Sequence, residues 1–390
     1  MNFKTPKKIE KVFTLVQHTP MIHFQAHAGA TLRHDEFKAK FDKYLYKEVE
    51  ASRKYIVPND QNNKGEMNVY ALDYTVDIEA VNKATPTIIA EGDTRNRPPM
   101  FFGNMGDEYI GNEKHTTVLT DVTLTIKSLK TDLLGIIETN LAAFLQQTNF
   151  GTRQSKGYGC FMLKDAELDW KGWYSLEGSS DWRATMGNIE DFYKVLRSGM
   201  NGVNRAGTSG YYCKPIIFDF TKDKLQWEKK TIKERFFNNA LSSQQTRHFT
   251  SEALHVKHKD KKNEVIKDLL GFATEERWTD RNATIYKKIE GVDRMKSPIL
   301  FKPIKEGKDY KVYFRCGEIP IKGKEMKITP YKNGTSNLFL KVYTARPDFF
   351  EKLMSHAMSI NWDTYMETYN GNGNKQRTEM KELFEKLKIN

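Results

Sequence analysis

The sequence predicts an α+β protein made of tandem ferredoxin-like domains with long loop insertions. Periodic segments in residues 1–165 follow one another as strand, helix, strand, strand, helix and strand, the order of the split β-α-β fold. A second series of strand-like and helix-like segments fills the rest of the 390 residues, a length that suits two domains. We expect one domain over residues 1–170, with a glycine-rich loop at 149–159, and a second α+β domain over 171–390.

The composition is that of a globular chain with a cationic surface. Hydrophobic residues make up 38% and aromatic residues 12%, enough for cores, while 29% of the residues are charged. Lysine and arginine exceed aspartate and glutamate by 12. Such a field attracts polyanions, of which nucleic acid is the commonest inside cells. The excess alone does not decide function, because many soluble proteins are mildly basic.

Neither an export signal nor a membrane span is visible in the sequence. The amino end has no long apolar segment, and no run approaches about 18 apolar residues. The three cysteines, Cys160, Cys213 and Cys316, are odd in number and far apart, which is typical of free thiols in a reducing compartment. We expect a cytoplasmic protein without a membrane partner, a metal or a cofactor.

The first domain is expected to begin with a strand and a helix. Lys11–Gln17 is rich in β-branched and apolar residues, which favours a strand. Phe37, Phe41 and Val49 then recur at helical spacing, with Asp35 as a suitable N-cap. The later elements are expected to be strands at 69–78, 85–91, 118–126 and 157–164 and an amphipathic helix at 131–147. Between them, Gly92–Lys114 is a Gly-, Pro- and Asn-rich excursion, and loops of this length are usually functional or disordered.

The second half is less regular. A helix is expected from about Asp181, followed by a strand pair in YYCKPIIFDF and LQWEKK and a helix in KKTIKERFFNNAL. SPILFKPI, DYKVYFRC and NLFLKVY are strand-like, and helices are expected behind Pro347 and at the carboxyl end. Leu254–Lys267 is a dense cationic patch. No sequence repeat is strong enough to prove a duplication.

The segment NFGTRQSKGYG, Asn149–Gly159, is the most distinctive motif. It is not a P-loop, because Tyr158 stands where Ser or Thr would be required, and it precedes a strand rather than opening a helix. Gly151 suits the position after a helix end, but capping does not explain further glycines with Arg153 and Lys156 between them. Glycines let a polyanion approach the backbone, and amides with cations hold phosphates. We therefore predict a phosphate-backbone site, with a structural turn as the alternative.

A ferredoxin-like unit whose last helix runs into a basic glycine-rich loop resembles the RAMP superfamily of CRISPR effector proteins, whose domains are RRM-like. The loop departs from the family pattern by having Asn149 at the first glycine. GATLRHDEFKAKFDKYL and RPPMFFGNMGDEYIGNEKHTTVLTDVTL resemble two further family segments. In the second half, DRMKSPILFKPI is similar to a segment of the double-RAMP subunit that caps type III-B (Cmr) complexes. The second domain could then be a second RAMP domain.

The resemblance implies a non-catalytic subunit that binds CRISPR RNA or target RNA and other CRISPR effector subunits. Single-stranded RNA is held by cations on its phosphates and by aromatic rings on its bases. The contacts that the resemblance implies come from Arg33, Lys38, Arg95, Arg97, Gly151, Arg153, Lys156, Gly157, Gly159, Arg294 and Lys296, with Tyr158 as a stacking ring. The excursion at 92–114 would match the family's thumb.

Two other interpretations remain open at this stage. The first is a RAMP endoribonuclease, for which His23, His27 and Asp35 are the candidate acid-base residues. We do not favour it, because the spacing of the two histidines falls in an expected loop and has no geometric meaning there. The second is a basic protein–protein scaffold. No HxH, CxxC or HExxH pattern is present, so the sequence predicts no metal site.

Overall fold

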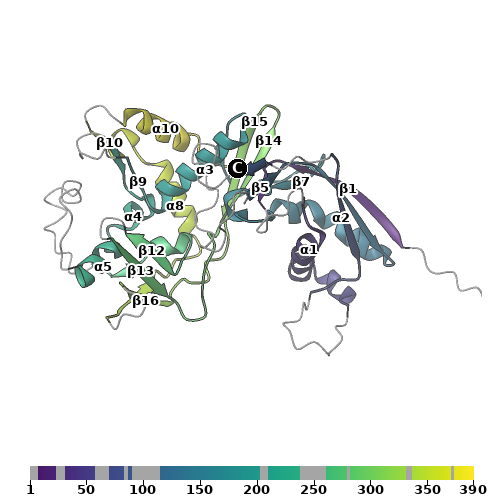
Figure 1. Cartoon of the computed structure of the whole chain (residues 1–390), viewed down its shortest axis with the longest axis horizontal. Helices are drawn as coiled ribbons and strands as arrows, with labels where there is room; N and C mark the ends of the chain where they lie inside the picture. Colours follow the sequence, from purple (N-terminus) through teal and green to yellow (C-terminus); the bar gives the residue numbers. More distant parts are fainter. Residues whose placement is uncertain are drawn as a thin grey trace, which may run out of the picture. The chain divides into compact units, whose positions relative to one another are not determined.

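The computed structural model of the chain describes residues 8–22, 31–57, 70–82, 87–89, 115–202, 210–237, 261–278, 282–330, 336–369 and 373–390 (Figure 1). The chain forms two compact units. Unit 1 comprises residues 1–187, 300–314 and 389–390, and unit 2 comprises residues 188–299 and 315–388. Each unit therefore combines segments that are distant in sequence. The boundary expected near residue 170 stays a prediction.

Unit 1 contains a four-stranded antiparallel sheet of strand order β3-β6-β1-β7. Its strands are β1 (Ile9–Gln17), β3 (Thr75–Ala80), β6 (Val122–Ser128) and β7 (Phe161–Leu163), and α1 (His34–Glu48) and α2 (Thr131–Gln146) form the two crossovers in chain order. The sheet order is thus second, third, first and fourth strand. This is the ferredoxin-like arrangement, which confirms the predicted fold.

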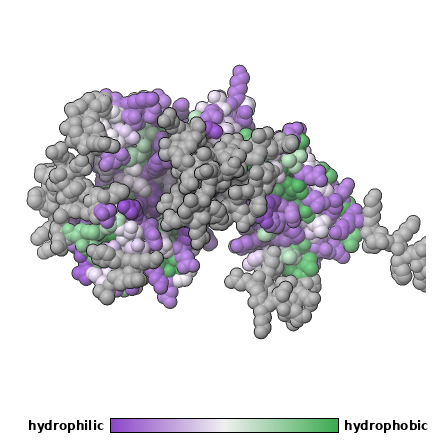
Figure 2. Space-filling view, viewed as in Figure 1, coloured by the Kyte–Doolittle hydropathy of each residue, from purple (hydrophilic) through white to green (hydrophobic). Residues whose placement is uncertain are grey.

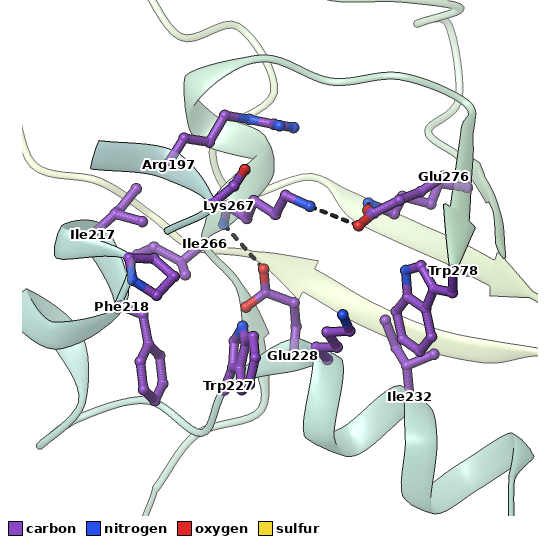
Figure 3. Close-up of a pocket in the computed structure, with 14 residues that line it drawn as sticks. Arg197, Ile217, Phe218, Trp227, Glu228, Ile232, Ile266, Lys267, Glu276 and Trp278 are labelled. Carbon is purple, nitrogen blue, oxygen red and sulfur yellow. Dashed lines mark hydrogen bonds and ion pairs between the residues drawn. The ribbon is translucent and has the colours of Figure 1, made fainter. Parts of the chain in front are cut away.

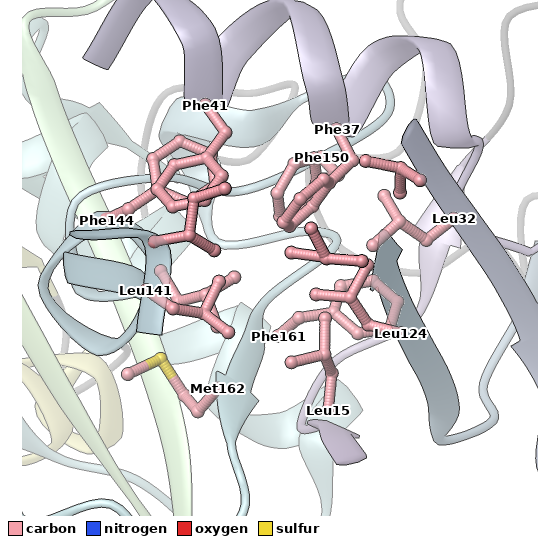
Figure 4. Close-up of a cluster of buried hydrophobic side chains, with 14 of the residues drawn as sticks. Leu15, Leu32, Phe37, Phe41, Leu124, Leu141, Phe144, Phe150, Phe161 and Met162 are labelled. Atoms are coloured by element: carbon pink, nitrogen blue, oxygen red, sulfur yellow. The ribbon is translucent and has the colours of Figure 1, made fainter. Parts of the chain in front are cut away.

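The core of this sheet and its helices is aromatic (Figure 4). Phe37 and Phe41 of α1 meet Phe144 of α2 with ring centroids 5.6 and 4.6 Å apart, above Leu15 and Leu124 of the sheet. The helical spacing in the sequence was therefore a true core signal. The expected N-cap was wrong, because the cap position is Arg33 and Asp35 lies in the first turn.

A second four-stranded sheet repeats the same topology. Its strands are β8 (Tyr174–Glu177), β14 (Ile299–Glu306), β15 (Asp309–Cys316) and β19 (Lys388–Ile389), in the order β14-β15-β8-β19. In sequence, α3 (Trp182–Arg197) follows β8, and α10 (Asn374–Glu385) precedes β19. The strands again stand in the order second, third, first, fourth. The tandem ferredoxin-like fold is confirmed, with insertions between α3 and β14 and between β15 and α10 that are long enough to hide the repeat in the sequence.

One strand expected at 118–126 is two strands in different sheets. The strand β5 (His115–Val118) lies between β2 (Met21–Ile22) and β4 (Thr87–Ile89), whereas β6 begins at Val122. The buried side chain of Gln17 separates them, because it donates to the carbonyl of Val118 (2.7 Å) and accepts from the amide of Thr120 (2.7 Å). A side chain thus replaces the strand partner at these residues.

Unit 2 holds two further sheets. One has the order β18-β10-β9 and the other the order β11-β17-β16-β13-β12. Their strands are β9 (Met200–Asn201), β10 (Gly210–Cys213), β11 (Glu264–Val265), β12 (Glu275–Trp278), β13 (Ala283–Lys288), β16 (Glu325–Thr329), β17 (Leu338–Val342) and β18 (Met366–Tyr369). Its further helices are α4 (Ile216–Thr221), α5 (Glu228–Phe236), α8 (Phe349–Met358) and α9 (Trp362–Tyr365), with a 3₁₀ turn at Lys267–Leu270. Unit 1 has 3₁₀ turns at Glu50–Tyr55 and Gln154–Lys156.

The strand pair expected in YYCKPIIFDF and LQWEKK was wrong. Only Gly210–Cys213 is a strand, and Pro215 then serves as the N-cap of helix α4. Proline lacks an amide donor and is tolerated at the start of a helix, where that donor is not needed. Similarly, Trp227 is the N-cap of α5.

The surface agrees with the charged composition. On the face drawn in Figure 2, hydrophilic residues cover most of the described surface. No helix in the described part of the chain is both long and apolar enough to cross a membrane.

Candidate nucleic-acid interface

The glycine-rich loop begins where α2 ends, and a buried lysine closes that helix. Lys302 of β14 is fully buried, and its ammonium group donates to the carbonyls of Leu145 (2.8 Å) and Thr148 (2.9 Å) and to Oδ1 of Asn149 (2.8 Å). A cation is favourable there, because the carbonyls at a helix C-terminus lack partners and carry partial negative charge. Lys302 therefore fixes the point from which the loop starts.

Asn149, which departs from the family pattern, ties the loop together. Its side-chain amide donates to the carbonyls of Gln154 (2.7 Å) and Phe301 (2.9 Å), so one residue holds both the loop and strand β14. A glycine at this position could make neither bond. Sequence reasoning missed this role, and the signal that could have found it is a lysine inside the apolar strand ILFKPI.

The glycines of the loop are required by its own packing. Gly151, Gly157 and Gly159 have φ values of 74°, 94° and 65°, a region that glycine enters without strain. A Cβ on Gly159 would lie 2.0 Å from the carbonyl oxygen of Phe150, and one on Gly151 would lie 2.6 Å from that of Ile22. The structural alternative therefore explains these glycines.

Six backbone amides of the loop already have acceptors within the chain, and four of them belong to the glycines and to Thr152. The amides of Gly151, Thr152, Gly157 and Gly159 donate to Glu36 Oε1 (3.0 Å) and to the carbonyls of Ile22 (2.8 Å), Gln154 (3.2 Å) and Pro20 (2.9 Å), respectively. A phosphate could bind them only by replacing these bonds. This corrects the expectation that Gly151, Gly157 and Gly159 offer exposed amides.

The carboxylate of Glu36 sits where an anion would bind the loop. It accepts from the amide of Gly151, from Lys40 Nζ (2.6 Å) and from Gln154 Nε2 (3.4 Å). Lys40 also donates to the carbonyl of Asn149 (3.0 Å), which joins α1 to the loop. The chain thus supplies its own anion at this position.

The side chains of the loop differ in their exposure. Arg153 is half-buried, and its backbone is left-handed (φ 58°), which is rare for a residue with a side chain. The ammonium group of Lys156 is buried. Tyr158 is fully buried, with its ring edge-on to Trp182 at 6.5 Å between centroids. Tyr158 therefore cannot stack on a base in this conformation, which corrects that expectation.

The candidates around α1 are engaged in ion pairs. Arg33 is exposed and binds Asp35 with two hydrogen bonds (3.0 and 2.5 Å). The hydrogen bond from Arg33 holds the pKa of Asp35 below its usual range, so this carboxyl is a poor general acid. Lys38 donates to buried Asp42 (2.7 Å) and lies 4.0 Å from the ring centroid of Tyr74.

Sequence reasoning missed the exposed basic face of α1. Lys40, Lys43 and Lys47 follow one another at intervals of three and four residues and therefore share a helix face, and the last two are exposed. Lys40 joins this face to the loop. The spacing of the lysines was a visible signal, although charge runs on helices usually only contact solvent.

The remaining candidates belong to unit 2 or lie outside the described residues. Arg294 and Lys296 belong to unit 2 and are exposed, alternating with buried Met295 and Ser297. His23, His27, Arg95, Arg97 and the whole excursion at 92–114 lie outside the described residues. Among the residues that the structure describes, no cluster of three or more His, Cys, Asp or Glu side chains could hold a metal ion.

Unit 2 contains a pocket of about 520 Å³ that is open to solvent (Figure 3). Its walls include the apolar side chains of Pro215, Ile217, Phe218, Trp227, Ile232 and Trp278. The charged part of the lining consists of four cations, Arg197, Lys229, Lys267 and Lys287, and two carboxylates, Glu228 and Glu276. No sequence motif predicted this pocket, because its residues come from several separate segments between 197 and 287.

The floor of the pocket is an ordered ion network. Lys287 pairs with Glu276 (2.6 Å) and Asp268 (3.0 Å), and Lys267 pairs with Glu276 (2.6 Å). Burial opposes the ionisation of Glu276, but the two lysines hold its pKa well below the usual range. Burial raises the pKa of Glu228, whose Oε1 accepts from the amide of Lys267 (3.2 Å).

Comparison with known families decides the relationship. A family model described as the Cmr1 N-terminal domain matches residues 8–200, and one described as the Cmr1 C-terminal domain matches residues 212–388. The chain belongs to the Cmr1 family. The resemblance to the RAMP superfamily of type III CRISPR effector proteins is thereby confirmed. No curated protein sequence matches the chain.

Two solved structures are more distantly similar. A crystal structure of Cmr1 from Pyrococcus furiosus in its apo form is 8% identical, with a TM-score of 0.36, over 92% of this chain and 98% of that one. A chain in a cryo-EM structure of the type III-B Cmr-beta bound to cognate target RNA is 14% identical, with a TM-score of 0.28, over 41% of this chain. That match spans 60% of the other chain. With both scores below 0.5, the assignment to the Cmr1 family depends on the family models.

Proposed function

We propose that the chain is a non-catalytic, RNA-binding subunit of a type III CRISPR RNA-guided effector complex, working in the cytoplasm. Its partners are CRISPR RNA or target RNA and the neighbouring effector subunits. Membership of the Cmr1 family supports the assignment to such a complex. The excess of 12 cationic residues supports a polyanionic partner.

The RNA backbone contacts unit 1 through side chains rather than through loop amides. The observation that carries this part is the left-handed backbone of Arg153, at φ 58°. Such a conformation costs about 1 kcal/mol or more in a residue other than glycine, persists only where the surrounding structure enforces it, and is most frequent at functional sites. The surface that we propose consists of Arg153, exposed Arg33 and the lysine face of α1.

The substitution Arg153→Gly tests RNA binding without destabilising the loop. Arg153→Gly removes the cation and also the backbone strain, so the thermal midpoint should stay unchanged or rise slightly. The affinity of the full chain for a single-stranded 20-nucleotide RNA should fall several-fold. The slope of log K against log salt should decrease by about 0.7 for each phosphate that the side chain of Arg153 no longer neutralises. Both are measured by fluorescence anisotropy at several salt concentrations.

Lys127→Ala is the matched control. Lys127 is also cationic and partly exposed, but its ammonium group is paired with Asp77 at 2.9 Å on the sheet. This variant should leave affinity and salt slope unchanged. Equal RNA affinity and slope in Arg153→Gly and the unaltered chain would remove the loop from the proposed surface and would favour a scaffold.

A further inference from the structure

The pocket of unit 2 contains two buried polar atoms that lack partners. Glu228 is 6% exposed, and its Oε2 has no hydrogen-bond partner in the described part of the chain. Trp278 is 4% exposed, and its indole Nε1 likewise has no acceptor among the described residues. Both residues line the pocket, and Glu228 lies between Trp227 and Trp278 in Figure 3. The pocket therefore presents one acceptor and one donor.

Leaving such atoms unpaired is unfavourable. A buried polar atom without a partner costs on the order of 1–3 kcal/mol, and more when it is charged. A ligand that donates an N–H to Glu228 Oε2 and accepts from Trp278 Nε1 would remove this cost.

The lining residues indicate which charge and shape a ligand of this pocket would have. With Asp268 of the floor included, the four cations outnumber the carboxylates by one, and Lys229 lies 5.1 Å from the ring centroid of Trp278. A guanidinium or ammonium ligand would therefore meet net repulsion, although it could donate to Glu228. A neutral planar heterocycle attached to a phosphate meets aromatic walls and an attractive field instead.

We propose that this pocket takes one base of single-stranded RNA, with an amino group of the base donating to Glu228 Oε2 and a ring or carbonyl acceptor facing Trp278 Nε1. The inference rests on the proposed RNA-binding function and adds a base preference to it. Adenine, cytosine and guanine have an exocyclic amino group. Uracil has no exocyclic amino group, and its ring N–H lies between two carbonyl oxygens. These oxygens would be repelled by the carboxylate oxygen of Glu228. The pocket therefore discriminates against uridine.

The test compares two RNAs of ten nucleotides, one of cytidine and one of uridine, labelled at the 5′ end and bound to the full chain. The expected result is roughly five-fold tighter binding of the cytidine oligomer, the effect of about one hydrogen bond. Glu228→Gln should bring the ratio of the two affinities to within about two-fold. Its amide oxygen can still accept from the amide of Lys267, so the fold is retained, and an unchanged thermal midpoint verifies this.

Lys230→Ala is the control on the same helix. Lys230 lies outside the pocket lining and pairs with Glu234 at 3.8 Å, so this variant should leave the affinity ratio unchanged. Equal binding of both oligomers, or a preference that survives Glu228→Gln, overturns the base pocket while RNA binding stands. Absence of binding to either oligomer overturns both proposals. If both oligomers bind equally and Glu228→Gln no longer associates with one of the effector subunits, the base pocket is overturned and the pocket holds a side chain of that subunit instead.

Discussion

Lys302 and Asn149 are 153 residues apart in sequence, yet their side chains are hydrogen-bonded at 2.8 Å in the interior of unit 1. The lysine comes from β14 and the asparagine from the start of the glycine-rich loop. A strand encoded in the second half of the chain thus fixes the loop encoded in the first half. The loop conformation should therefore depend on Lys302.

Lys302→Met should destabilise unit 1 strongly. The substitution keeps an unbranched side chain, shorter by one heavy atom, but leaves the acceptors of Leu145, Thr148 and Asn149 without their shared donor. We expect a loss of about 2–4 kcal/mol in the free energy of unfolding, because buried acceptors lose their partner. Urea denaturation measures it. Lys305→Met, at an exposed position of the same strand, should change stability by less than about 0.5 kcal/mol. Similar effects of the two variants would contradict the role of Lys302.

Two glycine-to-alanine substitutions should change the stability of the chain in opposite directions. Gly159→Ala places a Cβ 2.0 Å from a carbonyl oxygen at a φ of 65°, so the loop must rearrange, and we expect a loss of several kcal/mol. Gly135→Ala lies in helix α2, with nothing within 4 Å of the new Cβ. It should stabilise the chain by about 0.5–1 kcal/mol, because alanine favours helix. Thermal midpoints compare the two, and a stable Gly159→Ala would show that the loop is not tightly packed.

The first ferredoxin-like domain could be predicted because its core signal is local. Phe37 and Phe41 on one helix and Leu124 on an alternating strand carry the periodicity that places them inside. The lysine inside the apolar strand ILFKPI indicates that Lys302 has a buried partner, but nothing in the sequence indicates that this partner is Asn149. The same holds for Glu228, whose acceptor is exposed to a pocket only after distant segments have folded.

The sequence-based assignment of strands was wrong at two places where one neighbouring residue changes the local structure. Gln17 ends a strand by pattern, but its side chain takes the place of a neighbouring strand at Thr120. Ile216 and Ile217 suit a strand by composition, but Pro215 starts a helix there. In the glycine-rich loop, the amide of Gly151 donates to the carboxylate of Glu36, a partner that the motif did not indicate, and phosphate binding by the loop stays a prediction.

His18 should make stability depend on pH. Burial, together with Lys302 and Lys305, lowers its pKa from 6.5 to about 4. The unfolded state therefore binds the proton more readily between these values, and stability is lost as the pH falls from about 6.5 towards 4. His18 Nδ1 accepts from the amide of Lys305 (2.9 Å), a bond that the oxygen of asparagine can replace. His18→Asn should match the unaltered chain at pH 7.5 and exceed its stability at pH 5.0 by about 1–2 kcal/mol. An equal difference in stability between His18→Asn and the unaltered chain at pH 7.5 and at pH 5.0, measured by thermal melting, would contradict the role of His18.

Lys287 should be essential for the fold of unit 2. It is 6% exposed and neutralises Asp268 and Glu276 from a position between them. Lys287→Met would leave buried Asp268 and partly buried Glu276 short of a partner, and removing one member of a buried ion network costs about 3–5 kcal/mol. Lys288→Met, at the exposed neighbouring position of β13, is the control and should change little. Limited proteolysis reports on each unit separately: new cleavage should arise within 188–299 or 315–388 in Lys287→Met, while the fragment that carries the first sheet stays intact. Protection equal to that of Lys288→Met would mean that the network adds nothing net, because the cost of burying its charges cancels their attraction.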